Sequence, residues 1–79
     1  MFNTNAFTNR DLCEEIGEYY GEFYEDMSGY LNIDNGDQVF TYQTEEELLK
    51  DWLPTLQETE DDLQDGYWAD VIEYIQDLD

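Results

Sequence analysis

The charge imbalance of this sequence limits the folds that it can adopt. The chain has 79 residues, with 22 Asp and Glu against only 2 Lys and Arg, which gives a formal net charge of -20. Most carboxylates therefore have no cation within the chain to pair with, and their mutual repulsion opposes a compact state. A folded state must keep the acids at the surface and depend on an apolar core. The excess charge thus indicates a role outside folding.

Enough apolar material is present to build that core. Hydrophobic residues make up 41% of the chain and aromatic residues 16%, with Trp52 and Trp68 among them, whereas disordered acidic segments are poor in aromatics. The length fits one compact domain over residues 1–79. Adaptation to concentrated salt is a second explanation for the acidity, and it predicts an even spread of charge without a pattern.

Nothing in the sequence indicates secretion or membrane insertion. The start, residues 1–5, lacks basic residues and a long apolar run, and no stretch approaches the ~20 apolar residues of a membrane span. Cys13 is the only cysteine, so no disulfide can form within the chain. We therefore expect a cytoplasmic protein that is a monomer or homodimer and binds no membrane.

A long amphipathic helix is predicted from about Asn9 to Met27. Thr8 is a suitable N-cap, and Asp11 stands three residues later, as in a capping box. Apolar residues recur at helical spacings of three and four, at Leu12, Ile16, Tyr19, Tyr20, Phe23, Tyr24 and Met27. Acids recur on the other side, at Asp11, Glu14, Glu15, Glu18, Glu22, Glu25 and Asp26. Gly17 and Gly21 either let another element approach closely or make room for neighbouring Tyr rings, and the second reading is preferred.

A β-hairpin is predicted next. Ser28-Gly29 ends the first helix, because glycine suits the position after a helix C-terminus. Asn35-Gly36 then separates two β-prone runs, which is a strong hairpin signal. Strands are expected at about 30–33 and 38–42.

Two acidic helices are predicted after the hairpin. Thr44 precedes three Glu residues, which is a capping box with acids where the helix dipole favours them. Pro54 either ends this helix near Leu53 or kinks it. The apolar spacing to Leu56 favours a kinked helix that continues to about Glu58.

The densest acidic stretch, 58–66, leads into a final helix over about 67–78. The buried stripe expected for that helix consists of Trp68, Val71, Ile72, Ile75 and Leu78. The order of an N-terminal amphipathic helix, a β-hairpin and two C-terminal acidic helices predicts an α+β fold.

Catalysis and metal binding are not expected. The chain has no His, which removes the commonest general base and the His-based triads. Cys13 lies beside Glu14 and Glu15, whose charge disfavours a thiolate. No Gly-rich phosphate loop occurs, and EF-hand loops aligned on Gly36 or Gly66 lack acids at required positions. We therefore expect a non-enzymatic protein without a cofactor or metal.

The sign of the charge argues against direct nucleic-acid binding and suggests the inverse role. Phosphate contacts rely on Lys and Arg, whereas a rigid surface with rows of carboxylates presents a DNA-like field to a basic groove. The 58–65 stretch, the hairpin turn and the acidic side of the first helix could supply such rows. The residues expected to contact the partner are Glu58, Glu60, Asp61, Asp62, Asp65, Asp34, Asp37, Glu18, Glu22 and Glu25.

The layout and charge of the chain resemble those of small acidic DNA mimics from phages and mobile elements, which include anti-restriction proteins and anti-CRISPR inhibitors of type II Cas9. The features that carry the resemblance are Asn35-Gly36-Asp37, Thr44-Glu45-Glu46-Glu47 with the Leu/Trp face behind it, and the 58–65 run. No specific motif is shared, and the first helix is more acidic and aromatic here.

The resemblance implies that acids of the hairpin turn and of the inter-helix stretch occupy a DNA- or PAM-reading groove. The partner would be a basic DNA- or RNA-binding protein, such as a Cas nuclease or a restriction enzyme. An acidic accessory or chaperone subunit of another basic partner is the alternative.

Overall fold

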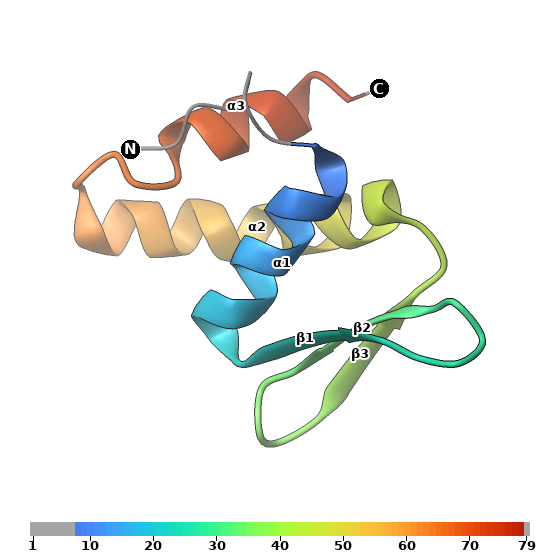
Figure 1. Cartoon of the computed structure of the whole chain (residues 1–79). Helices are drawn as coiled ribbons and strands as arrows, with labels where there is room; N and C mark the ends of the chain where they lie inside the picture. The colour runs from blue at the N-terminus through green and yellow to red at the C-terminus, as the bar shows by residue number, and fades with distance from the viewer. Residues whose placement is uncertain (1–7, 79) are drawn as a thin grey trace.

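The computed structural model describes residues 8–78, which form three helices and a three-stranded antiparallel sheet (Figure 1). This confirms the predicted α+β layout of an N-terminal helix, a hairpin and two C-terminal helices, and it adds one strand before the hairpin. The elements in chain order are α1 (Asn9–Tyr20), β1 (Glu22–Glu25), β2 (Leu31–Asp34), β3 (Val39–Tyr42), α2 (Glu45–Leu63) and α3 (Ala69–Gln76).

The helix α1 begins as predicted but ends earlier. Thr8 Oγ1 accepts a hydrogen bond from the Asp11 N–H, and the Asp11 carboxylate accepts one from the Thr8 N–H, which confirms the capping box. The prediction of a helix to Met27 is wrong from Gly21 onward, because the four residues of β1 pair with β2 instead. Two aromatic residues within β1 fit a strand well, and glycine lowers the propensity to continue a helix.

Gly17 and Gly21 allow the sheet to approach α1 closely. A Cβ atom on Gly17 would lie 2.3 Å from the Cβ of Phe23, and one on Gly21 would lie 2.0 Å from the carbonyl oxygen of Asp34. Such distances are shorter than any real contact, so only glycine fits. The preferred explanation, room for Tyr rings, is therefore wrong, and the close approach of another element explains both residues.

The sheet is a meander with β2 in the middle. The predicted turn at Asn35-Gly36 is confirmed: the Asn35 N–H donates to the Gln38 carbonyl, and Gly36 has a φ of +96°, in the region that favours glycine. The prediction that Ser28-Gly29 ends the first helix is wrong, because that helix has already ended at Tyr20. The Ser28-Gly29 turn instead joins β1 to β2.

The helix α2 passes through Pro54 and continues to Leu63, beyond the predicted end near Glu58. Thr44 caps it as expected, with its Oγ1 accepting from the Glu47 N–H at 3.2 Å. The predicted capping box is incomplete, because the Glu47 carboxylate accepts from the Gln43 N–H rather than from the Thr44 N–H. Most acids of the 58–65 stretch therefore belong to a helix rather than to a connection between helices. The last helix, α3, is shorter than the predicted 67–78, although its stripe of buried residues is largely as expected.

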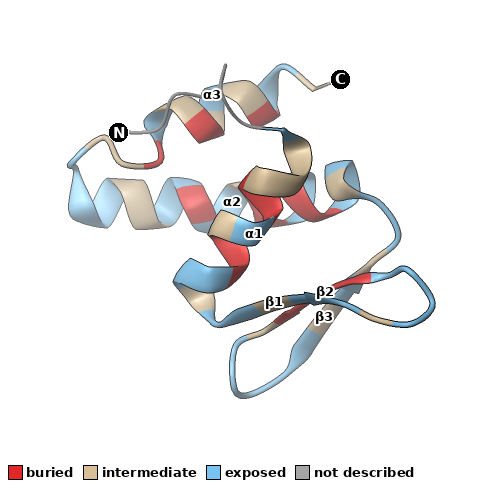
Figure 2. Cartoon of the chain, in the orientation of Figure 1, coloured by how far each residue is buried: buried red, intermediate tan, exposed pale blue. Residues whose placement is uncertain are grey.

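The core lies where the helices meet one face of the sheet (Figure 2). All three helices lie on the same side of the sheet, and α1 contacts β1, β2 and α2 (Figure 1). Aromatic rings pack between these elements. The ring centroids of Tyr20 in α1 and Trp52 in α2 are 4.9 Å apart, and those of Phe40 in β3 and Trp52 are 5.4 Å apart. The buried hydrophobic residues are Leu12, Cys13, Ile16, Leu31, Ile33, Leu48, Leu49, Trp52, Leu56, Trp68, Val71 and Ile75.

The contact across Gly17 should be sensitive to a single methyl group. We expect Gly17→Ala to lower the free energy of unfolding by about 1–3 kcal/mol, because the new Cβ overlaps that of Phe23 and neither backbone can move freely. Urea unfolding followed by circular dichroism measures this. Gln57→Ala, on the exposed side of α2, is the control and should change the value by no more than about 0.5 kcal/mol. Equal stability of the two variants would contradict the close contact.

Candidate protein-interaction site

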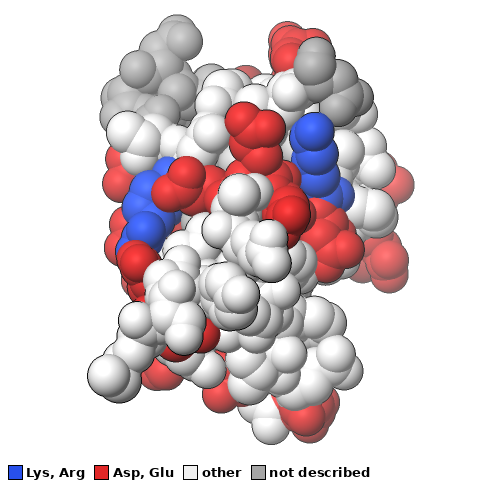
Figure 3. Space-filling model, turned by 90° about the vertical axis from the view of Figure 1, so that its right-hand side faces the viewer, with Lys and Arg blue, Asp and Glu red and all other residues white. Residues whose placement is uncertain are grey.

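The acids of the described part of the chain are all at least partly exposed, and none is buried. The chain's two cations, Arg10 and Lys50, are both seen on one side of the molecule, the side at the right of Figure 1 (Figure 3). Acidic side chains lie beside the cations on that side as well (Figure 3).

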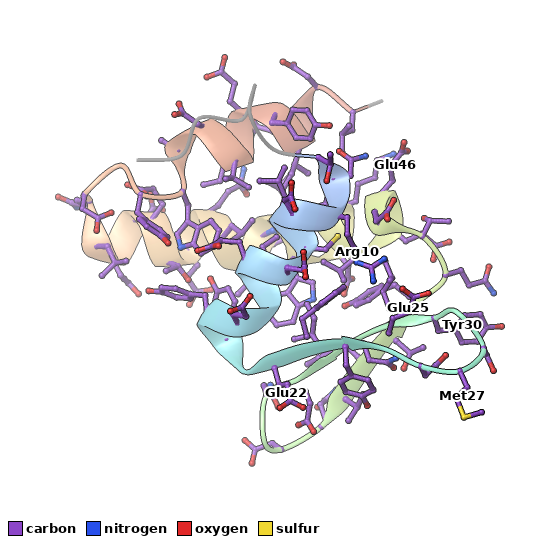
Figure 4. All side chains as sticks on the ribbon, in the orientation of Figure 1. Arg10, Glu22, Glu25, Met27, Tyr30 and Glu46 are labelled. Atoms are coloured by element: carbon purple, nitrogen blue, oxygen red, sulfur yellow. The ribbon has the colours of Figure 1, made fainter. Side chains whose placement is uncertain are left out.

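The Arg10 side chain contacts acidic and aromatic residues of the chain itself. Its Nη2 donates to Glu25 Oε1 at 2.5 Å, and its Nη1 lies 3.9 Å from Glu45 Oε2. The guanidinium also lies over the Phe23 ring, 5.3 Å from the centroid. The hydrogen bond to Glu25 raises the pKa of Arg10. Glu25, a predicted partner contact, thus has a cation beside it (Figure 4).

Several other predicted contact residues lie together on the opposite side. The Tyr20 hydroxyl, at the end of α1, is hydrogen-bonded to Thr59 of α2 at 2.6 Å, and Gly21 packs against the Asp34 carbonyl. The end of α1 therefore lies between the second half of α2 and the end of β2, on the left of Figure 1. We give the name acidic side to seven predicted contact acids of these segments and the adjoining β1, leaving out Glu25, which pairs with Arg10, and Glu60, which caps backbone groups: Glu18, Glu22, Asp34, Asp37, Glu58, Asp61 and Asp62.

Two acids of the 58–65 stretch have structural roles that the sequence analysis missed. Glu60 accepts hydrogen bonds from the backbone N–H groups of Gly66 at 2.7 Å and Trp68 at 3.0 Å. Asp65 accepts one from the Tyr67 N–H at 2.9 Å. These carboxylates hold the connection between α2 and α3. Glu60 is therefore a weaker candidate for partner contact than its exposed neighbours.

The remaining acids of this stretch are not explained by folding. Glu58, Asp61 and Asp62 are exposed, and within residues 8–78 they make no hydrogen bond or ion pair. Asp61 and Asp62 lie in the last turn of α2, which contains no basic residue. Acids at a helix C-terminus oppose the helix dipole. Their placement costs stability and indicates that they serve another purpose.

The geometry gives no support to covalent or metal chemistry. Cys13 is buried, its Sγ lies 3.7 Å from the Glu45 carbonyl oxygen, and burial raises the pKa of its thiol to about 12. Among the described residues no group of three or more His, Cys, Asp or Glu could hold a metal ion. No helix of that part is long and apolar enough to cross a membrane.

The surface hollows are small for a ligand pocket. One of about 210 Å³ is lined by Asp70, Glu73 and Tyr74 of α3 and by Asp77, which follows the helix. Another of about 260 Å³ lies beside Arg10 and Glu25. Small-molecule sites commonly occupy about 300–1,000 Å³ and are mostly apolar, so an extended surface is a better candidate for recognition than either hollow.

No protein-family model matches the chain, and neither a curated protein nor a solved structure is significantly similar to it.

The two capping hydrogen bonds of Glu60 give a test of its role. We expect Glu60→Ala to lower the free energy of unfolding by about 1–3 kcal/mol, because two partly buried N–H groups lose their acceptor. Thermal or urea unfolding provides the measurement. Glu58→Ala and Asp61→Ala, which remove no such contact, should stay within about 0.5 kcal/mol of the parent chain. A loss as large in these controls would show that Glu60 is not special.

Proposed function

We propose that this chain is a DNA-mimic inhibitor that occupies the basic nucleic-acid groove of another protein, in the first instance a Cas nuclease such as Cas9. It acts without catalysis, by competing with DNA for the Lys and Arg residues that grip phosphate. Steric exclusion and electrostatic attraction together carry out the inhibition, and the attraction speeds association.

The observation that carries the proposal is the density of the exposed charge. The described part extends 35 Å along its longest axis. Duplex DNA of that length carries about 20 phosphate charges, at about one per 1.7 Å. The formal net charge of the chain is -20, and Asp79 is the only acid outside the described residues. The folded chain thus offers a charge per length similar to that of DNA.

The position of the two cations away from the acidic side supports the same proposal. The acidic side combines exposed carboxylates from α1, α2 and the sheet, while Arg10 and Lys50 lie on another side (Figure 3). Because the helices and the sheet share one core, these carboxylates are held on a rigid scaffold. Rigid placement lowers the conformational entropy that is lost on binding, whereas a flexible acidic tail would lose more of it.

Competition with DNA tests the proposal. We expect the chain to inhibit DNA binding by a purified Cas9–guide RNA complex, with an affinity that falls steeply between about 0.05 and 0.2 M salt, because counterion-linked contacts weaken in that range. Added PAM-containing duplex should displace the chain. A type I restriction endonuclease assayed in parallel separates the anti-CRISPR from the anti-restriction role.

A matched pair of variants locates the contact. Changing Glu58, Asp61 and Asp62 to Lys should abolish inhibition while the helical circular dichroism signal remains. Changing Glu46, Glu73 and Asp77 to Lys makes the same change in charge at the start of α2, on α3 and just after α3, and should leave most of the inhibition. Binding that is indifferent to both salt and DNA would refute the mimic. Folding that fails below molar salt would instead favour adaptation to a saline solvent.

A further inference from the structure

The sheet has one face that no described helix covers. Its register pairs Glu22 with Asp34 and Asp34 with Val39. In the next row it pairs Tyr24 with Asn32 and Asn32 with Thr41. Because side chains alternate along a strand, both rows point away from the buried Ile33 and hence from the helices (Figure 1). We call these residues the outer sheet face: Glu22, Tyr24, Asn32, Asp34, Val39 and Thr41.

The outer sheet face is ordered before any partner binds. Asn32 is only 3% exposed, although no described helix covers it. Its Oδ1 accepts from Thr41 Oγ1 at 2.7 Å, and its Nδ2 donates to Asp26 Oδ2 and to the Tyr30 carbonyl. Around this satisfied network the Tyr24 and Val39 side chains are 38% and 46% exposed. The face therefore combines fixed geometry with exposed apolar surface.

The acids of this face repel each other in the free chain. Glu22 and Asp34 stand directly opposite on neighbouring strands, and like charges in that arrangement destabilise a sheet. Asp34 has a structural role, because its Oδ1 accepts a hydrogen bond from the Gly36 N–H at 2.8 Å in the hairpin turn. Glu22 is exposed and makes no hydrogen bond or ion pair with any of residues 8–78. A cation from outside the chain would relieve this repulsion.

The inner side of the same strand shows which cation fits. There, Arg10 lies over the Phe23 ring and forms an ion pair with Glu25. On the outer side, Tyr24 and Glu22 offer the same combination of an aromatic ring and a carboxylate two residues apart, without a cation from the described residues. Figure 4 shows Glu22 and Glu25 at opposite ends of β1, with Arg10 beside Glu25.

We propose that the outer sheet face docks an arginine-bearing surface of a partner protein, with a guanidinium stacked on Tyr24 and paired with Glu22. The inference rests on the proposed function in taking the partner to be a basic protein. Arginine suits this site better than lysine, because its planar fork both stacks on rings and pairs with carboxylates. The site adjoins the acidic side through Glu22 and Asp34, so one partner can contact both.

Charge selects this occupant over the others. A second copy of the chain would bring Glu22 and Asp34 against their equivalents in an assembly of two molecules that each carry -20. Nucleic acid is anionic and needs cations on the protein. Anionic lipid is likewise attracted by basic segments and repelled by acidic ones.

A peptide titration followed by NMR tests the site directly. Hexa-arginine is added to the isotope-labelled full chain at about 0.1 M salt, with hexa-lysine as the comparison. We expect the first and largest amide shifts in β1, β2 and β3 and a shift of the Tyr24 ring signals, with arginine binding about fivefold more tightly than lysine. Shifts that centre on α2 and α3 instead would overturn the inference.

Two variants with the same charge change provide the second test. Glu22→Lys with Val39→Lys alters the outer sheet face, and Glu73→Lys with Gln76→Lys alters exposed positions of α3. We expect the first pair to weaken hexa-arginine binding about tenfold and the second about twofold or less, since only the first removes the docking carboxylate. Glu22→Lys alone should unfold no more easily than the parent chain, because it removes the repulsion with Asp34.

The outcomes separate this inference from the proposed function. Equal weakening by both pairs would show attraction by net charge alone and would overturn the docking surface, whereas inhibition of the nuclease would still stand. Docking at the outer sheet face with no inhibition of either DNA-binding enzyme would support the surface and refute the DNA mimic.

Discussion

The packing of α1 against the sheet and α2 is the contact on which the rest of the structure depends. Leu12, Cys13 and Ile16 are buried there, and Gly17 lets Phe23 of β1 pack directly against the backbone of the helix. The eight-residue α3 is too short to be stable alone, and a sheet of three short strands needs its apolar face buried to be stable. Their burial against α1 and α2 must also offset the repulsion of a chain with net charge -20. Aromatic residues such as Trp52 and Trp68 supply much of this buried surface.

Local signals predicted the elements well, and the limits of the prediction have physical causes. Capping at Thr8 and Thr44 and the Asn35-Gly36 turn depend on neighbouring residues, so they could be read from the sequence. The strand β1 could not be predicted in this way, because four residues are too few to distinguish the two-residue period of a strand from the 3.6-residue period of a helix. Its pairing depends on contacts with distant β2 and on the space left by Gly17. A glycine immediately before Glu-Phe-Tyr-Glu was the available signal.

Prediction of the site was limited by the same dependence on distant contacts. Sequence alone marks every acid of the 58–65 stretch as equal, yet Glu60 and Asp65 cap backbone groups while Glu58, Asp61 and Asp62 do not. Equally, a helix to Met27 would have placed Glu22 and Glu25 on one stripe. In the strand they lie on opposite faces, so that Arg10 pairs with Glu25 and leaves Glu22 without a cation from the described residues.

The acids without structural partners link folding to binding. Repulsion between Glu22 and Asp34, and the unfavourable place of Asp61 and Asp62 at the end of α2, raise the free energy of the folded chain. A partner that supplies cations reduces both unfavourable electrostatic interactions and binds the folded state selectively, so binding stabilises the fold. Salt relieves them as well by screening, but it weakens the attraction to the partner. The conditions in which the free chain is most stable are therefore those in which it binds most weakly.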